Sequence, residues 1–303
     1  GRCQNPFKKE LLFLEELFLF PCNSLLLPGI KIIKILFPAK GEIVLIIISL
    51  RGKAKVALAV VVLSLFVILF VNYFPFQIGE GIIASVMGKN ALKPIYSVDT
   101  DEKKISLSLD ACWGAERTKK ILDILDKYKV KTTFFLVNIW LEDYPNMAKE
   151  VAKRGHEIGL HSATHPHFTQ LSVDEMKKEL KSNRDMVKKV TGYNAKLFRP
   201  PFGDYNNTVI ETVMDMKLIP VQWSVDSLDW KEEYTAEQIA KRVLDQVENG
   251  SIVLMHNDGK HTPEVLEMII PQLQRQGYTI VPVSELLIKD DWYVDVNGVQ
   301  RKK

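Results

Sequence analysis

The chain has 303 residues, of which 47% are hydrophobic and 25% charged, an ordinary composition for a folded protein of one large domain or two small ones. Its net charge of +3 is unevenly distributed along the chain. Residues 1–55 carry nine Lys or Arg against four Asp or Glu, and the remaining residues are slightly acidic in sum. No nucleic-acid partner is therefore expected. The three cysteines share no metal-type spacing and indicate no disulfide framework.

Residues 1–53 show no regular pattern. The segment is apolar, keeps no single helical or strand period, and is broken by Pro21, Pro28 and Pro38. We leave it unassigned, as an N-terminal extension that we hypothesise is not native to the working protein. Peptide analysis of the natively expressed protein would refute this hypothesis by finding these residues.

The next segment predicts the topology. Residues 56–79 contain no charge, and about 20 helical residues cross a hydrocarbon core of roughly 30 Å. We expect a transmembrane helix or signal anchor over 54–76 and a linker over 77–103. Three cations lie at 51–55, so the positive-inside rule places the C-terminal region outside the cytoplasm, held at the cell membrane. Secretion after signal cleavage and a buried core helix are the alternatives.

From residue 104 onward, strand-like and helix-like runs alternate. Residues 116–128 and 172–190 have the apolar spacing of amphipathic helices, and the second opens on an S-x-x-E capping box at Ser172 and Glu175. The alternation predicts an α/β fold, either a parallel barrel or an open doubly wound sheet. The candidate strands are 105–109, 132–137, 156–160, 196–199, 220–225, 251–255 and 278–283.

Ionisable side chains gather just after these strands, whereas the opposite strand ends carry Lys104, Lys131, Gly155 and Gly250, which are typical of turns. Both candidate architectures place their chemistry in the loops at the carboxyl ends of the strands. We therefore predict an active site there. Its candidate residues are Asp110, His161, His165, Arg199, Asp226, Asp229 and His256.

Several residues in these loops also have a simpler, structural interpretation. His161 and His165 are four apart, which on a helical turn suits a divalent metal, but such a pair alone is weak evidence of a site. Asp229 suits a loop or a helix cap, and His256 a core position. Trp230 suits either the core or stacking on a sugar ring.

The segments SLDA, HSATH, RPPFG, DSLDW and VLMH follow one another along the chain. In this order and spacing they resemble the signature motifs of the polysaccharide deacetylase family, also called the NodB homology domain or carbohydrate esterase family 4. The resemblance covers residues 104–288, which leaves 289–303 as a C-terminal tail. Within the family, the chain is most similar to the membrane-anchored sporulation-type deacetylases of endospore-forming bacteria.

The resemblance implies a distorted (β/α)7-8 barrel of the NodB type. It also implies the hydrolysis of N-acetyl groups on N-acetylglucosamine-type polysaccharide, peptidoglycan or chitin-like, in cell-wall or spore-cortex modification. The implied cofactor is a divalent metal, usually zinc, with cobalt or manganese as alternatives. A metal lowers the pKa of bound water from near 15.7 to about 7, and a histidine can supply the acid that amide cleavage needs.

The resemblance also implies a role for each matched residue. His161 and His165 would bind the metal as neutral imidazoles, and Asp110 would be the base that activates the attacking water. Arg199 would orient this base, and His256 would be the acid that protonates the leaving amine. The other matched residues are Asp229, which would tune the acid, Phe202, whose backbone N–H would polarise the acetyl oxygen, and Trp230 and Leu254, which would wall the acetyl pocket.

One position departs from the family pattern. The first motif of the family ends in two aspartates, the second a metal ligand, and here that position is Ala111. The free coordination position is left to water, to Asp110 or to nothing. Cys112 offers a thiolate, but strand alternation argues against it. We therefore keep a second hypothesis, a catalytically weak or inactive glycan-binding or sporulation scaffold protein, although the retained residues favour the enzyme.

Overall fold

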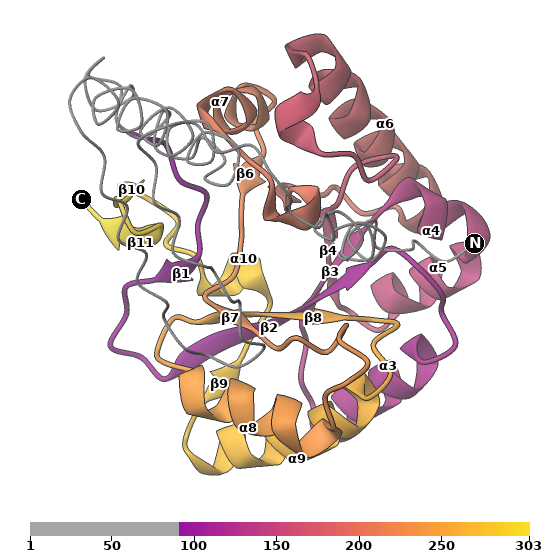
Figure 1. Cartoon of the computed structure of the whole chain (residues 1–303), viewed down its shortest axis with the longest axis vertical. Coiled ribbons are helices and arrows are strands. Elements are labelled where there is room, and N and C mark those ends of the chain that lie inside the picture. Colours follow the sequence, from indigo (N-terminus) through magenta and orange to yellow (C-terminus); the bar gives the residue numbers. More distant parts are fainter. Residues whose placement is uncertain (1–90) are drawn as a thin grey trace, which may run out of the picture. The chain divides into compact units, whose positions relative to one another are not determined.

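The computed structural model describes residues 91–303 (Figure 1). The predicted extension, the predicted transmembrane helix and most of the predicted linker lie outside the described residues. Among the helices of the described part, none has both the length and the apolar character needed to cross a membrane.

Short strands and amphipathic helices alternate along the described chain. The strands are β1 (Ser97–Val98), β2 (Lys104–Ala111), β3 (Thr133–Leu136), β4 (Glu157–Leu160), β5 (Leu197–Phe198), β6 (Ile219–Pro220), β7 (Val225–Asp226), β8 (Ile252–His256), β9 (Thr279–Ile280), β10 (Trp292–Val294) and β11 (Val299–Lys302). The helices are α3 (Thr118–Lys127), α4 (Asn138–Asp143), α5 (Pro145–Lys153), α6 (Val173–Thr191), α7 (Asn207–Asp215), α8 (Ala236–Gln246), α9 (Thr262–Arg275) and α10 (Val283–Leu286), with 3-10 turns at Phe168–Gln170 and Pro201–Gly203.

The main sheet is a half-barrel of parallel strands. Its order is β6-β5-β4-β3-β2-β8-β7, and β9 pairs with the first residues of β2. Within residues 91–303 the end strands β6 and β7 do not pair with each other, so the sheet stays open. The predicted α/β class is confirmed, but the predicted barrel is present only as this half-barrel (Figure 1).

The two faces of the sheet carry different side chains, because successive residues of a strand point to opposite sides. Leu109 of β2 and Phe134 of β3 belong to the larger apolar cluster. Ser108 and Asp110 of β2 point to the other face, where both contact Arg199. Asp110 and Arg199 of the predicted site therefore lie on the face opposite the larger apolar cluster.

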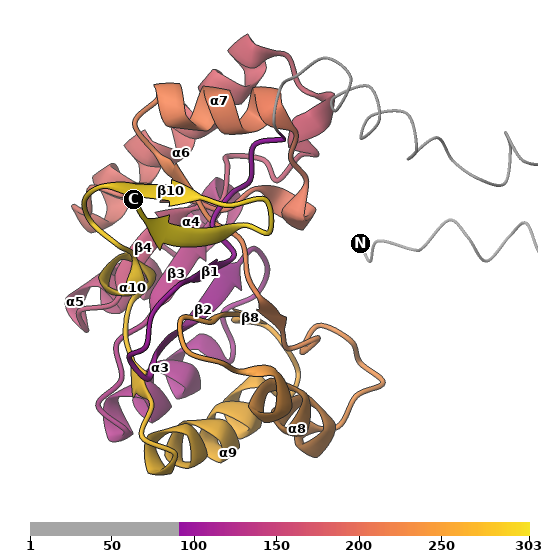
Figure 2. The same cartoon turned by 90° about the vertical axis from the view of Figure 1, so that its left-hand side faces the viewer.

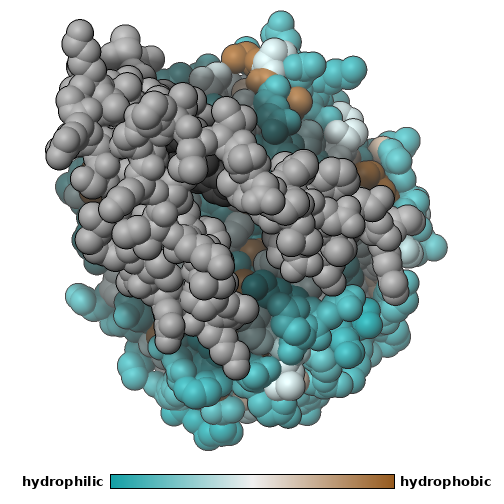
Figure 3. All heavy atoms as spheres, viewed as in Figure 1, coloured by the Kyte–Doolittle hydropathy of each residue, from teal (hydrophilic) through white to brown (hydrophobic). Residues whose placement is uncertain are grey.

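The helices follow one another in the same order as the strands. α8 packs against α9, α9 against α3, α3 against α5, α5 against α6 and α6 against α7 (Figures 1 and 2). One continuous row of helices is the arrangement of a barrel rather than of a doubly wound sheet. Over α8 and α9, the surface seen in Figure 3 is mostly hydrophilic, as expected for the outer faces of amphipathic helices.

Both helices singled out in the sequence are confirmed, as α3 and α6. The capping box of α6 is formed, since Ser172 Oγ accepts from the backbone N–H of Glu175 while the Glu175 carboxylate accepts from that of Ser172.

The predicted strand 220–225 is wrong, because it is two strands, β6 and β7, with a break between them. The break has tertiary causes. The Gln222 N–H donates to the carbonyl of Ile95 at 2.7 Å, and the Gln222 carbonyl accepts from Arg199 Nη2 at 3.1 Å. These partners engage the backbone of Gln222 away from the neighbouring strands and interrupt the strand there, although Val221 still donates to Phe198 of β5 and Ser224 to Ile252 of β8.

A small second sheet covers part of the polar face. β11 pairs in parallel with β1 and antiparallel with β10, so residues 289–303, predicted as a tail, contain a β-hairpin. The smaller apolar cluster joins Ile95 and Val98 to Phe135, Leu197 and Ile252, which lie on or beside the strands of the main sheet. This cluster gives the half-barrel an apolar filling beside the polar residues.

Candidate active site

Asp110 lies at the carboxyl end of β2. Its Oδ1 accepts a hydrogen bond from Arg199 Nη1 at 2.7 Å, and its Oδ2 lies 3.5 Å from His161 Nε2. Burial raises the pKa of the Asp110 carboxyl, but the guanidinium of Arg199, with His161 and His256 also nearby, outweighs burial and holds the pKa below its usual value. Asp110 is therefore a buried carboxylate that is ionised at neutral pH.

Arg199 follows β5, three places from β2 in the strand order. The side chain is completely buried, and its Nη2 donates to Ser108 Oγ at 2.8 Å. The guanidinium lies over the ring of Phe135, 4.2 Å from the centroid. One side chain can reach from β5 to Asp110 because the sheet curves. This is the arrangement that the orienting role predicted for Arg199 requires.

His161 follows β4 and faces Asp110. Its Nδ1 donates to the Arg199 carbonyl at 2.8 Å, which leaves the lone pair on Nε2. Its backbone N–H donates to Asn183 Oδ1 at 3.0 Å, and Asn183 Nδ2 donates to the Leu136 carbonyl at 3.0 Å. Burial lowers the pKa of the His161 imidazole in spite of Asp110, so the ring is neutral. A neutral imidazole with a fixed lone pair suits a metal ligand.

His165 lies in the loop after β4. Ser162 and His165 both have left-handed backbone conformations, with φ of 73° and 58°, and the His165 N–H donates to Ser162 Oγ at 3.0 Å. The Glu179 carboxylate of α6 accepts from two backbone N–H groups of this loop at 2.8 Å. Burial, together with the neighbouring imidazole of His161, lowers the pKa of His165 to about 4. The two rings lie 4.9 Å apart by centroid, brought together by this loop rather than by the helical turn we expected.

Cys112 joins the two histidines, and the expectation that it points away is wrong. Its Sγ and one nitrogen of each of His161 and His165 all lie within 4.8 Å of one another. Alternation directs Cys112 away from Ala111 but onto the same face as Asp110. Burial raises the pKa of the Cys112 thiol well above its usual value, and nearby carboxylates add to this. One sulfur and two imidazole nitrogens form a donor set that suits zinc or cobalt.

His256 is the register partner of Asp110 across the adjacent strands β8 and β2. Its Nδ1 lies 2.8 Å from Asp229 Oδ1, and its backbone N–H donates to Asp229 Oδ2 at 2.8 Å. Thr262 Oγ1 also donates to Asp229 Oδ2, at 2.6 Å. Burial lowers the pKa of His256, but the charge of Asp229 outweighs it and raises the pKa to about 9. His256 is therefore protonated at neutral pH.

Two exposed aromatic side chains border the histidines. Phe202 is 61% exposed, and its ring lies 4.5 Å from that of His165 and stacks on that of His167 at 4.3 Å. Trp113, in the loop after β2, is 54% exposed, with its ring 6.4 Å from that of His165. Aromatic rings with one free face can hold an apolar sugar face.

The remaining predicted substrate contacts lie near the His256–Asp229 pair. Trp230 follows Asp229 and is 54% exposed. Leu254 is buried on β8, two residues before His256 and thus on the same face. The structure places every predicted site residue at or near the carboxyl ends of the parallel strands, while the roles assigned to them stay predictions.

The sequence reasoning missed the residues that hold the site in place. Ser108, which accepts from Arg199, lies two residues before Asp110, so strand alternation could have identified it. Asn183 and Glu179 on α6 and Thr262 on α9 gave no such signal, because only folding brings these helices beside the strand ends.

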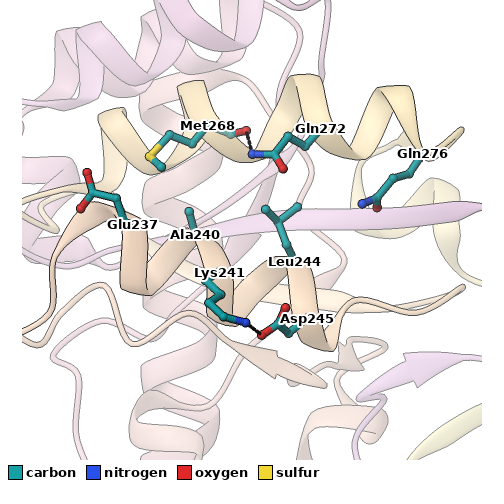
Figure 4. A pocket seen from close by; sticks show the side chains of 8 residues that line it. All are labelled: Glu237, Ala240, Lys241, Leu244, Asp245, Met268, Gln272 and Gln276. Carbon is teal, nitrogen blue, oxygen red and sulfur yellow. Dashed lines mark hydrogen bonds and ion pairs between the residues drawn. The ribbon is translucent and has the colours of Figure 1, made fainter.

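A cavity of about 420 Å³ lies apart from this cluster. It opens between α8 and α9, and none of the predicted site residues lines it (Figure 4). Its charged members include Lys241 and Asp245, which pair with each other. The lining residues are Glu237, Ala240, Lys241, Leu244, Asp245, Met268, Gln272 and Gln276.

Comparison with known proteins identifies the family. The sequence profile of polysaccharide deacetylases matches residues 97–221, which include Asp110, His161, His165 and Arg199. The chain is 33% identical over 195 residues to a peptidoglycan-N-acetylglucosamine deacetylase of Bacillus cereus, covering 63% of this chain and 70% of that protein. The chain belongs to the polysaccharide deacetylase family. The resemblance stated from the five motifs is therefore confirmed.

Two Bacillus subtilis relatives of the chain are longer than the region that they share with it. The chain is 34% identical over 195 residues to the uncharacterised protein YlxY, covering 64% of this chain and 60% of YlxY. It is 36% identical over 190 residues to the peptidoglycan-N-acetylmuramic acid deacetylase PdaC, covering 63% of this chain and 40% of PdaC. The chain thus spans less than two thirds of these two relatives. The relatives named as deacetylases are hydrolases.

Solved structures of polysaccharide deacetylases share the fold. Bacillus subtilis PdaA, a family 4 carbohydrate esterase, has a TM-score of 0.61 at 31% identity over 69% of this chain and 89% of that one. A family 4 pseudoenzyme from Bacillus anthracis has a TM-score of 0.62 at 32% identity over 69% of this chain and 73% of that one. A mutant described as that pseudoenzyme with restored activity matches at 35% identity. Membership of the family therefore includes active and inactive proteins.

Proposed function

We propose that the chain is a metal-dependent hydrolase that removes N-acetyl groups from N-acetylglucosamine-type polysaccharide, either peptidoglycan or a chitin-like glycan. One observation carries this proposal. An ionised Asp110, a protonated His256 and the Cys112, His161 and His165 cluster meet at one end of the parallel sheet. The names of the relatives, which are peptidoglycan deacetylases, support the substrate class.

Asp110 and His256 divide the proton transfers between them. Asp110 is a carboxylate at neutral pH and takes a proton from the attacking water, while Arg199 fixes its position. His256 holds its proton because its pKa is about 9, and gives that proton to the leaving amine. Two neighbouring groups whose environments push their pKa values apart are typical of an acid and base pair.

The residues present fit a divalent metal. The Nε2 lone pair of His161 lies 3.5 Å from the ionised Oδ2 of Asp110, and a cation bound in this region would offset their mutual repulsion. His161 and His165, whose rings lie 4.9 Å apart by centroid, would hold the ion. When bound, a divalent metal supplies a Lewis acid for the acetyl carbonyl and lowers the pKa of water. Zinc is the metal we propose, with cobalt or manganese as alternatives.

Exposed rings around the cluster would hold the polysaccharide. Phe202 and Trp113 lie beside His165, and the exposed Trp230 follows Asp229, so a sugar chain can stack on apolar rings near both the histidine pair and the His256–Asp229 pair. Leu254 gives the acetyl methyl group an apolar contact.

We further propose that the protein acts outside the cytoplasm at the cell membrane, in cell-wall or spore-cortex modification, and that secretion is the alternative. The uncharged run at 56–79 and the cations at 51–55 support this location.

A glycan-binding scaffold without turnover is the second candidate. Ala111 at the position of a family metal ligand favours it, and so does the presence of a pseudoenzyme among the structural neighbours. A scaffold needs the exposed aromatic rings but not the ionised pair of Asp110 and Arg199 or the charged His256.

Acetate release separates the two candidates. The full chain, supplied with zinc, cobalt or manganese, should release acetate from chitooligosaccharides or peptidoglycan, and His161→Ala should abolish the release. His261→Ala is the matched control, because His261 pairs with Glu264 and lies outside the cluster. Glycan binding without acetate release under every metal would instead support the scaffold.

A further inference from the structure

Ala111 leaves the metal cluster without the third ligand that the family resemblance implies. Its methyl group has no donor atom, and the residue is completely buried in the larger apolar cluster. Its register partner on β3 is Leu136. Any third protein ligand therefore comes from another residue.

Two side chains lie close enough to supply it, Asp110 and Cys112. Asp110 already has a partner, because its Oδ1 forms a buried ion pair with Arg199 at 2.7 Å. The described residues contain no hydrogen-bond partner for Cys112 Sγ, which lies within 4.8 Å of a ring nitrogen of both His161 and His165. Of these two candidates, Asp110 is already engaged in an ion pair, whereas the Cys112 sulfur has no hydrogen bond or ion pair to any of residues 91–303.

We infer that Cys112 binds the metal as a thiolate, the third protein ligand beside His161 and His165, and that Asp110 stays free to act as the base. This inference rests on the proposed function for the presence of a metal. In this arrangement the sulfur of Cys112 takes the place of the carboxylate that the family pattern has at position 111, one residue earlier in the chain.

The loop that carries Cys112 is anchored on both sides. Before it, the Asp110 carbonyl accepts from the Asn257 backbone N–H at 3.1 Å. After it, the Gly114 carbonyl accepts from Asn257 Nδ2 at 2.8 Å and from Trp140 Nε1 at 2.6 Å. Because Asn257 holds both ends, the position of Cys112 is set before any ion binds, as a ligand site requires.

The size of the cluster fits one ion. Donors on a tetrahedral zinc lie about 3.5 Å apart, given metal-ligand bonds of about 2.0 to 2.3 Å. The three donor atoms here lie within 4.8 Å of one another, so small side-chain rotations bring them onto one centre. A thiolate ligand favours zinc and cobalt, whereas manganese prefers oxygen donors. The inference therefore predicts that zinc and cobalt bind more tightly than manganese.

Cobalt absorption tests the ligand directly. The full chain with Cys3→Ser and Cys22→Ser keeps Cys112 as its only cysteine. With cobalt added, this parent should show the near-ultraviolet charge-transfer band of a thiolate bound to cobalt. Adding Cys112→Ser should remove the band and weaken cobalt affinity by about 100-fold or more, since even outer-shell changes weaken binding by 10- to 100-fold.

The parent spectrum is decisive without the variant, so a folding defect in Cys112→Ser does not obscure the result. Bound cobalt without the charge-transfer band would overturn the inference, and so would no binding of cobalt by the parent or equal affinity in the two proteins. Acetate release is measured separately. A charge-transfer band without acetate release supports Cys112 as a ligand and contradicts the proposed function. Acetate release without the band supports the proposed function and contradicts Cys112 as a ligand.

Discussion

The two faces of the parallel sheet bury their side chains for different reasons. On the face beneath the helices, Leu109 and Met255 are fully buried in an apolar cluster. On the other face, Asp110 and Arg199 are buried as an ion pair, at 4% and 0% exposure. Burial of apolar surface favours folding, whereas desolvation of an ion pair offsets most of its attraction. The comparison teaches that the first face supplies stability and the second supplies chemistry.

The largest effect is expected from Arg199→Met. It leaves the Asp110 carboxylate buried without a partner, which should lower the free energy of unfolding by about 3 to 5 kcal/mol and abolish acetate release. Urea unfolding and an acetate assay measure both effects. The double variant with Asp110→Asn should recover most of the stability and none of the activity.

Leu109→Ala is the matched change on the other face, with an expected loss of about 2 to 5 kcal/mol from the cavity that it leaves. Its activity should persist under conditions where the variant is folded. If Arg199→Met were as stable as the double variant Arg199→Met with Asp110→Asn, the unpaired buried carboxylate of Asp110 would not be what destabilises the single variant.

Asp229→Asn should change the pH dependence of the polar face. The pKa of His256 is about 9, so the native activity should fall as the pH rises through that value. Removing the Asp229 charge lowers this pKa to about 6.5 or below, and at pH 8 such a histidine is about 3% protonated, which predicts roughly 30-fold lower kcat. The pH profile of kcat is the measurement, and an unchanged alkaline limb would show that His256 is not the acid.

The same variant has a consequence for stability. A pKa raised on folding contributes stability that is fully present below about pH 6.5, the usual value of histidine, and is lost as the pH rises through about 9. Unfolding measured across this range should show that loss in the native chain and much less of it in Asp229→Asn.

The smallest effect is expected from Trp113→Ala. The side chain is 54% exposed, so its loss should leave the unfolding midpoint unchanged and raise KM about fivefold with little change in kcat. Val296→Ala, at a residue 79% exposed in the turn between β10 and β11, is the matched control. A fall in kcat at constant KM would mean that Trp113 acts on the reacting group rather than on sugar binding.

Much of the fold could be predicted because the longer strands are local apolar runs that end in ionisable residues and alternate with amphipathic helices. β2, β3, β4 and β8 are long enough to show this pattern. β6 and β7 have two residues each, and the break between them is set by Ile95 and Arg199, which are distant in sequence. No local pattern carries that information.

The candidate site divides in the same way. Asp110, His161 and His256 end recognisable strands, so their meeting followed from the topology of a parallel sheet. The direction of Cys112 was mispredicted because its orientation was compared with Ala111 rather than with Asp110, two residues away on the same face.

Gly159 has no functional atom, yet the active site depends on it. It pairs with Phe135 across β3 and β4, and a Cβ at this position would lie 2.4 Å from the Phe135 ring. That ring is the surface on which the Arg199 guanidinium rests. Even alanine at position 159 would push the ring and displace the guanidinium from Asp110. In a saturation library screened for activity, this backbone position should therefore be as intolerant as the acid and the base, for reasons of space alone.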